Sequence, residues 1–213
     1  MCTIKLKDLK LGDIVFSSAK GDTLTHALIS TGQSIFDHSE GDSKSVHAAI
    51  YAGNGNVIES SGDGIGYSPL DSKHTYLAYR FKEDDADNIL AETAADVAYT
   101  YYEEYQKNKK AGSYSILDAI LSLFKKKDKT IATKDAEDKI WGNEDGTLKT
   151  TFCSSFVIRC YEAASIACLS GLEDDSKFLT GIKADFKNTN PKTLQAKLRK
   201  SDEWQYKGKI DFK

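Results

Sequence analysis

The stretch SVHAAIYAGNGNVIESS, residues 45–61, places an Asn54-Gly55 dipeptide between two apolar segments. Asn-Gly in this setting is one of the strongest short-range signals for a β-hairpin, because both residues tolerate the positive φ values of a tight turn. The stretch therefore predicts two antiparallel strands. It places the imidazole of His47 on the first strand and the carboxyl group of Glu59 on the second.

The register of this hairpin decides whether His47 and Glu59 share a face, because strand side chains alternate between faces. If the Asn-Gly dipeptide alone forms the turn, Ile50 opposes Glu59 and the carboxylate points away from the imidazole. If residues 53–55 form a three-residue loop with a bulge, Ala49 opposes Glu59, which then lies diagonally beside His47. We predict the second register on functional grounds. A solvent-facing carboxylate at a strand end is the alternative.

Around the hairpin the sequence alternates between extended and helical patterns. Further strands are expected at residues 13–16, 64–70, 75–81 and 203–210, and apolar residues at helical spacing predict helices over residues 83–107, 113–124, 153–170 and 190–201. No internal repeat is visible. The pattern predicts a single α+β domain over residues 1–213, with an antiparallel sheet of about five or six strands and helices packed around it. The polar, lysine-rich stretch 125–149 is expected to be a surface insertion.

The composition argues against several classes of partner. The chain of 213 residues has a formal net charge of -3, with both signs spread along it, so no basic stripe favours nucleic acid or an anionic membrane. No uncharged run approaches the roughly 18 residues of a membrane span, and residues 1–16 lack the apolar core of a secretory leader. We expect a cytoplasmic protein without stable membrane insertion, or one exported without a cleaved leader.

Four cysteines are present: Cys2, Cys153, Cys160 and Cys168. They include no CxxC pair and are too few for a disulfide-stapled domain. The last three share one predicted helix, where residues seven apart lie about 10 Å apart along the axis, beyond the reach of a disulfide. We therefore expect free thiols, no zinc or other metal site and no cofactor.

Cys153 opens the predicted helix within TFCSSFVIRC, residues 151–160. Unpaired N–H groups and aligned peptide dipoles at a helix N-terminus favour a thiolate, which is the nucleophilic form of cysteine. Thr150 or Thr151 can cap this end. The alternative is a structural cysteine buried with the apolar stripe of the same helix, which consists of Phe156, Val157, Cys160 and Ala164.

A nucleophilic cysteine needs a base and a polar group that orients the base. Among the four histidines, His47 alone lies inside a strongly predicted strand, which holds an imidazole more rigidly than a loop does. Glu59 follows twelve residues later at the end of the next strand. The candidate catalytic set is therefore Cys153, His47 and Glu59.

These pieces resemble a known family. LKLGDIVF (9–16), VHAAIYAGNGNVIES (46–60) and FCSSFV (152–157) are similar to the circularly permuted NlpC-type papain-like cysteine hydrolases, especially the YiiX-like group, and more distantly to the lecithin retinol acyltransferase group. The resemblance covers roughly residues 9–80 and 150–165.

The resemblance implies a permuted papain-like fold in which Cys153 is the nucleophile, His47 the base and Glu59 its orienting partner. It implies a peptidase or amidase acting on a peptide or other amide substrate, with cell-wall peptides among the candidates. A bacterial effector, with an immunity or inhibitor protein as its partner, would also fit.

Two other functions stay open from the sequence. The acyltransferase relatives have the same residue order and act on acyl esters, so an acyltransferase, thioesterase or lipid hydrolase is the second enzyme hypothesis. The apolar segment SILDAILSLFKKK, residues 115–127, could then lie on a membrane, or it packs on the sheet. The third hypothesis is a binding module that keeps the fold without turnover.

Overall fold

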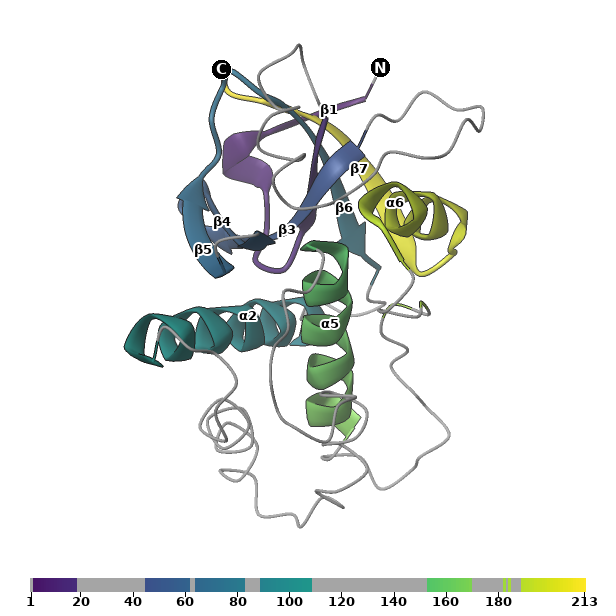
Figure 1. Cartoon of the computed structure of the whole chain (residues 1–213). Helices are drawn as coiled ribbons and strands as arrows, with labels where there is room; N and C mark the ends of the chain where they lie inside the picture. The colour runs from purple at the N-terminus through teal and green to yellow at the C-terminus, as the bar shows by residue number, and fades with distance from the viewer. Residues whose placement is uncertain are drawn as a thin grey trace.

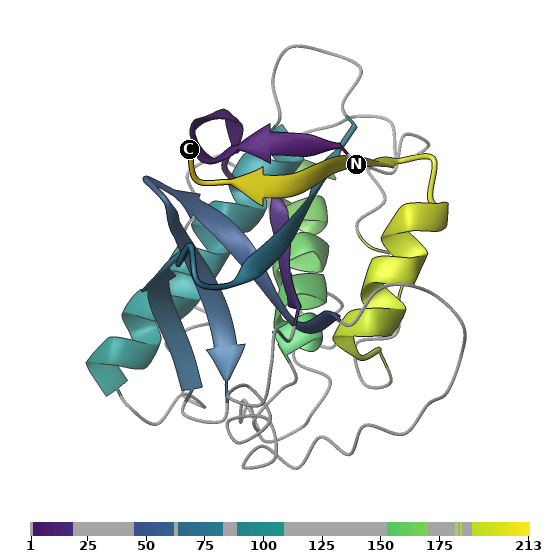
Figure 2. The ribbon, with the colours of Figure 1, turned by 90° about the horizontal axis from the view of Figure 1, so that it is seen from above.

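The computed structural model describes residues 2–18, 45–61, 64–82, 89–108, 153–169, 182, 184 and 189–213. Their strands form one seven-stranded sheet in the order β1-β7-β6-β2-β3-β4-β5 (Figures 1 and 2). In chain order the elements are β1 (Thr3–Lys5), η1 (Leu6–Asp8), β2 (Ile14–Ser18), β3 (Ser45–Gly53), β4 (Asn56–Ser61), β5 (Gly64–Pro69), β6 (Thr75–Phe81), α2 (Ile89–Asn108), α5 (Cys153–Leu169), α6 (Pro191–Lys200) and β7 (Trp204–Asp211).

The sheet is mixed, whereas a purely antiparallel sheet of five or six strands was predicted. The α+β class is confirmed, but the strand number and the pairing were wrong because β1 is an additional strand, and it pairs with β7 in parallel. Figure 2 shows these two strands, from opposite ends of the chain, side by side. A three-residue strand is too short to show an alternating pattern, and a parallel pairing between chain ends leaves no turn signal in the sequence.

The two faces of the sheet carry separate cores. α2 and α5 cover one face (Figure 1), where Ala48 and Ile50 of β3 contribute to the larger core. Ala49 and Tyr51 point to the other face and its smaller core. By strand alternation, His47 belongs to this second face. The smaller core consists of Ile4, Leu9, Val15, Ala49, Tyr51, Val57, Leu70, Ala78 and Ile210.

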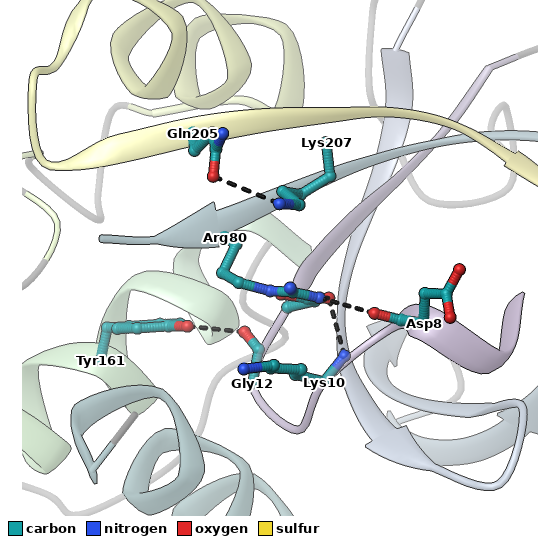
Figure 3. Close-up of polar contacts among 8 residues, drawn as sticks. Asp8, Lys10, Gly12, Arg80, Tyr161, Gln205 and Lys207 are labelled. Atoms are coloured by element: carbon teal, nitrogen blue, oxygen red, sulfur yellow. Dashed lines mark hydrogen bonds and ion pairs between the residues drawn. The ribbon is translucent and has the colours of Figure 1, made fainter. Parts of the chain in front are cut away.

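Helix α5 is buried along most of its described length. Its N-terminal end points toward β3 (Figure 1), and Phe156 packs edge-to-face on Tyr101 of α2 with ring centroids 5.8 Å apart. The hydroxyl of Tyr161 donates a hydrogen bond of 2.6 Å to the carbonyl oxygen of Gly12, in the turn before β2 (Figure 3). These contacts fix the position of the helix against the sheet, and with it the first residue, Cys153.

The turn before β2 is held by a buried ion pair. Arg80 of β6 donates from Nε and Nη2 to the two carboxylate oxygens of Asp13, at 2.8 and 2.7 Å. The same carboxylate accepts the backbone N–H of Lys10 at 2.9 Å, and Arg80 also reaches the carbonyl oxygen of Asp8 (Figure 3). Asp13 thus closes the turn that leads into β2 and ties it to β6.

Gly12 in this turn cannot be replaced by a residue with a side chain without strain. Its φ is +81°, which L side chains rarely adopt, and an added Cβ would lie 2.1 Å from the carbonyl oxygen of Ala91 in α2. The turn and the helix therefore approach each other backbone to backbone.

Several predicted elements match the structure, and others lie outside the described residues. The helix predicted over 83–107 is described from Ile89, and the helices predicted at 153–170 and 190–201 correspond to α5 and α6. Three predictions fall outside the described residues: the helix at 113–124, the surface insertion at 125–149 and the helix caps Thr150 and Thr151. Among the described helices, none combines the length and apolar character that a membrane crossing needs.

Candidate active site

The hairpin of β3 and β4 has the register that brings His47 and Glu59 to one face. Ile50 pairs with Ile58, and continuing this register places Glu59 opposite Ala49. The predicted register is therefore confirmed. His47, two residues before Ala49 on the same strand, is the diagonal neighbour of Glu59, within reach of a long side chain.

The turn that produces this register differs from the predicted one. Asn54 and Gly55 alone connect the strands, with φ values of 52° and 77°, and Gly53 pairs with Asn56. The extra residue is taken up by a register shift between Tyr51 and Gly53. A two-residue turn and a bulge in the strand thus give the same offset as a three-residue loop.

His47 and Glu59 form a short, direct contact. Nε2 of the imidazole lies 2.7 Å from Oε2 of the carboxylate. The other carboxylate oxygen, Oε1, accepts a hydrogen bond of 2.9 Å from the hydroxyl of Ser68 on β5. Both carboxylate oxygens are therefore engaged, and the imidazole is held by its Nε2.

Cys153 comes to this pair from the other end of the chain. It is the first residue of α5, where the backbone N–H groups have no partner within the helix. The hydroxyl of Ser154 donates a 2.6 Å hydrogen bond to the carbonyl oxygen of Thr189, and this anchors the end of the helix. The Cys153 side chain acts on His47 through a hydrogen bond and through charge. Since Nε2 faces Glu59, Nδ1 is the ring nitrogen left for the thiol.

These neighbours change the proton affinity of the imidazole. Burial is the largest single influence on His47 and lowers its pKa, because a buried cation loses hydration. The charge and hydrogen bond of Cys153, followed by those of Glu59, act in the opposite direction and raise the pKa from 6.5 to about 10. The site therefore favours the protonated form of the His47 imidazole.

The pKa of the Glu59 carboxyl group is lowered. Burial on its own raises the pKa of Glu59, but the hydrogen bond and charge of His47 and the hydrogen bond from Ser68 outweigh it and lower the pKa. Glu59 is therefore an ionised acceptor at neutral pH, which is the state that can hold a cationic ring.

The three members of the candidate set differ in exposure. The side chains of His47 and Glu59 are 22% and 25% exposed, whereas Cys153 is only 3% exposed. The imidazole is therefore more accessible than the sulfur beside it. This is the arrangement in which one ring can exchange protons with both the thiol and an entering substrate.

The remaining cysteines have other environments. All four thiols are free. Cys160 is fully buried, and burial raises the pKa of its thiol, which makes it unreactive. Cys168 lies 3.8 Å from the hydroxyl of Thr93, and Cys2 is exposed at the chain start. Cys153 interacts with a histidine, His47, which separates it from an ordinary core cysteine.

Ser68 is the site residue that sequence reasoning missed. Val57 pairs with Ser68 across β4 and β5, so the hydroxyl lies on the same face as Glu59. The alternation of GIGYSP together with the register of β4 could have placed it there. Within the residues that the structure describes, no group of three or more His, Cys, Asp or Glu side chains could hold a metal ion.

We compared the chain with protein families, curated proteins and solved structures. No protein-family model, no curated protein and no solved structure matches this chain. What the site can do therefore follows from its own geometry.

Proposed function

We propose that this protein is a cysteine-dependent hydrolase that cleaves an amide bond, on a circularly permuted papain-like fold. Cys153 is the nucleophile, His47 the general acid and base, and Glu59 the group that fixes the imidazole. The observation that carries the proposal is one imidazole held between a thiol at a helix N-terminus and a carboxylate at 2.7 Å. Histidine on a strand followed by cysteine at the start of a packed helix supports the assignment of the fold.

The first chemical step is attack on the substrate carbonyl. The Cys153 thiolate forms a C–S bond to the carbonyl carbon, and the C=O electron pair moves onto the oxygen to give an oxyanion. The backbone N–H of Cys153 is a suitable donor to this oxyanion, since donors at such a position commonly lower the barrier by several kcal/mol. The His47 imidazolium then gives its proton to the leaving nitrogen, and the C–N bond breaks.

The acyl-enzyme changes the character of His47. A thioester at Cys153 has no negative charge, so the largest influence that raises the His47 pKa disappears once the sulfur is acylated. The neutral imidazole can then take a proton from water, the hydroxide adds to the thioester carbonyl, and the C–S bond breaks to release the acid and the thiolate. The ring that is an acid in the first half of the reaction is thus a base in the second.

The protonation states of His47 in these two steps favour an amide over an ester as substrate. An amine is a poor leaving group unless it is protonated as the C–N bond breaks, whereas an alkoxide or thiolate needs this less. An imidazolium maintained by Cys153 and Glu59 supplies that proton at neutral pH.

The test is hydrolysis by the purified protein of two substrate sets, soluble peptidoglycan fragments and a mixed peptide library, followed by mass spectrometry of the products. Cleavage that is lost in Cys153→Ala and retained in Cys2→Ala is expected. Cys2 is the matched control because it is an exposed cysteine just before β1, and its thiol donates to the carbonyl oxygen of Lys207 instead of a histidine. Full activity in Cys153→Ala would overturn the proposed function.

A further inference from the structure

Glu59 is a long carboxylate side chain in a position where a small error in orientation matters. It has three rotatable side-chain bonds, and its loss of rotamer freedom opposes a single fixed geometry. Its partner across the strand pair is Gly66, which has no side chain to pack against it. A Cβ added at Gly66 would lie 4.0 Å from Cγ of Glu59 and 3.7 Å from Oγ of Ser68. The carboxylate therefore extends past Gly66 toward Ser68.

Ser68 contacts the carboxylate oxygen that His47 leaves open. Its hydroxyl donates to Oε1 at 2.9 Å, while Oε2 lies 2.7 Å from Nε2 of the imidazole. Two hydrogen bonds in different directions stop the carboxylate from turning about its last bond. The hydroxyl is a donor to an ionised acceptor, a class of hydrogen bond stronger than a neutral one.

We propose that Ser68 is a positioning residue for the catalytic set, the outermost member of a chain that runs Ser68, Glu59, His47, Cys153. This inference rests on the proposed function. Ser68 touches neither the sulfur nor a substrate carbonyl in this scheme. It holds Glu59 ionised and aimed at Nε2, and Glu59 in turn keeps Nδ1 directed at the thiol.

A purely structural reading of the same contact makes a different prediction. If the hydroxyl only links β4 to β5, its removal lowers stability and leaves the acid–base behaviour of the site unchanged. If it positions Glu59, its removal shifts the pH at which the site loses its active protonation state. The hydrogen bond from Ser68 lowers the pKa of Glu59, so losing it moves the acid limb of the pH profile to higher pH.

The experiment compares two isosteric variants, Ser68→Thr and Ser68→Val, which both suit a strand and differ by one hydroxyl. The readout is the rate of alkylation of Cys153 by iodoacetamide across the pH range, measured by peptide mass spectrometry. The exposed Cys2 in the same molecule is an internal reference thiol. Ser61→Ala is a further control, because the Ser61 hydroxyl donates to the carbonyl oxygen of Gly64 instead of a carboxylate.

We expect Ser68→Val to slow alkylation of Cys153 about three- to tenfold and to move the acid limb upward, as expected for the loss of one hydrogen bond. Ser68→Thr should retain the wild-type profile, and Ser61→Ala should have no effect. Ser68→Ala gives the same comparison without a branched side chain, should the valine variant prove unstable.

The outcomes separate the two hypotheses. If Cys153 reacts fast in the wild type and slowly in His47→Gln, but Ser68→Val and Ser68→Ala match the wild type in rate and pH profile, the positioning role is wrong and the hydrolase proposal stands. If wild-type Cys153 reacts no faster than Cys2 at any pH, both proposals fall.

Discussion

Two carboxylate–cation pairs in this protein have the same contact distance and opposite uses. Asp13 and Arg80 meet at 2.7 Å, with side chains 0% and 15% exposed, and His47 and Glu59 also meet at 2.7 Å but are 22% and 25% exposed. The guanidinium of Arg80 does not lose its proton in a protein, so the first pair has a fixed cation. The imidazole of His47 can, and it has a thiol on its other side. The buried pair with a fixed cation, Asp13 and Arg80, holds a turn. The partly exposed pair with a titratable cation, His47 and Glu59, can exchange protons.

The largest effect should come from removing the titratable cation. His47→Gln deletes the group that both accepts and returns the proton, so we expect substrate turnover to fall by about 10²- to 10⁴-fold, the usual contribution of a general acid–base residue. Stability at neutral pH should fall as well, because the raised pKa of His47 stabilises the folded state there.

The measurement is kcat/KM together with the alkylation rate of Cys153. His74→Gln is the matched control, since His74 lies 3.9 Å from the Asp71 carboxylate but on an exposed turn. A His47→Gln protein with wild-type turnover would contradict the assignment of the base.

The next effect concerns stability alone. Arg80→Met leaves the buried Asp13 carboxylate without its cation, and breaking a buried pair in this way typically costs about 3–5 kcal/mol of unfolding free energy. The measurement is chemical denaturation of both proteins under conditions where the variant is folded. Alkylation of Cys153 in the folded variant should stay at the wild-type rate, because the Asp13 pair does not contact the candidate site.

The double variant Asp13→Leu/Arg80→Met tests the cause. It removes the unpaired charge along with the pair and should recover part of the lost stability. An Arg80→Met protein as stable as the wild type would show that the pair contributes nothing to the turn.

The same contrast explains what the sequence could and could not predict. The contact between His47 and Glu59 depends on a local hairpin, and local hairpins carry their own signals in the Asn-Gly turn and in the strand alternation. Cys153 at a helix start was likewise predictable from the apolar spacing of the segment that follows it. Even so, the turn was predicted wrongly, because a bulge and a longer loop give the same register.

Long-range pairings have no such signal. Asp13 and Arg80 are 67 residues apart, and nothing in either neighbourhood indicates the other. The parallel pairing of β1 with β7 joins the two ends of the chain in the same way. Ser68 lies between these cases, since its strand was predicted but its contact with Glu59 depends on the register of a second strand pair.

The smallest effect is a change in pH dependence that links Cys153 to His47. In the unfolded chain the imidazole has a pKa near 6.5, whereas in the folded protein burial lowers it and Cys153 and Glu59 together raise it to about 10. The folded state therefore binds this proton more tightly. The resulting stabilisation is fully present below about pH 6.5 and is lost as the pH rises toward 10.

Cys153→Ala removes the charge of Cys153, which is the largest contribution that raises the His47 pKa. The His47 pKa should therefore fall, and the pH range over which its protonation stabilises the folded state should narrow. The measurement is the unfolding free energy from about pH 6 to pH 10 for three proteins: the wild type, Cys153→Ala and the control Cys2→Ala. Stability should fall more steeply with rising pH in the wild type and in the control than in Cys153→Ala. NMR titration of the His47 ring should show the same difference directly. Identical pH dependence in all three proteins would mean that the thiol does not act on the imidazole, and His47 and Glu59 would then be a second structural pair like Asp13 and Arg80.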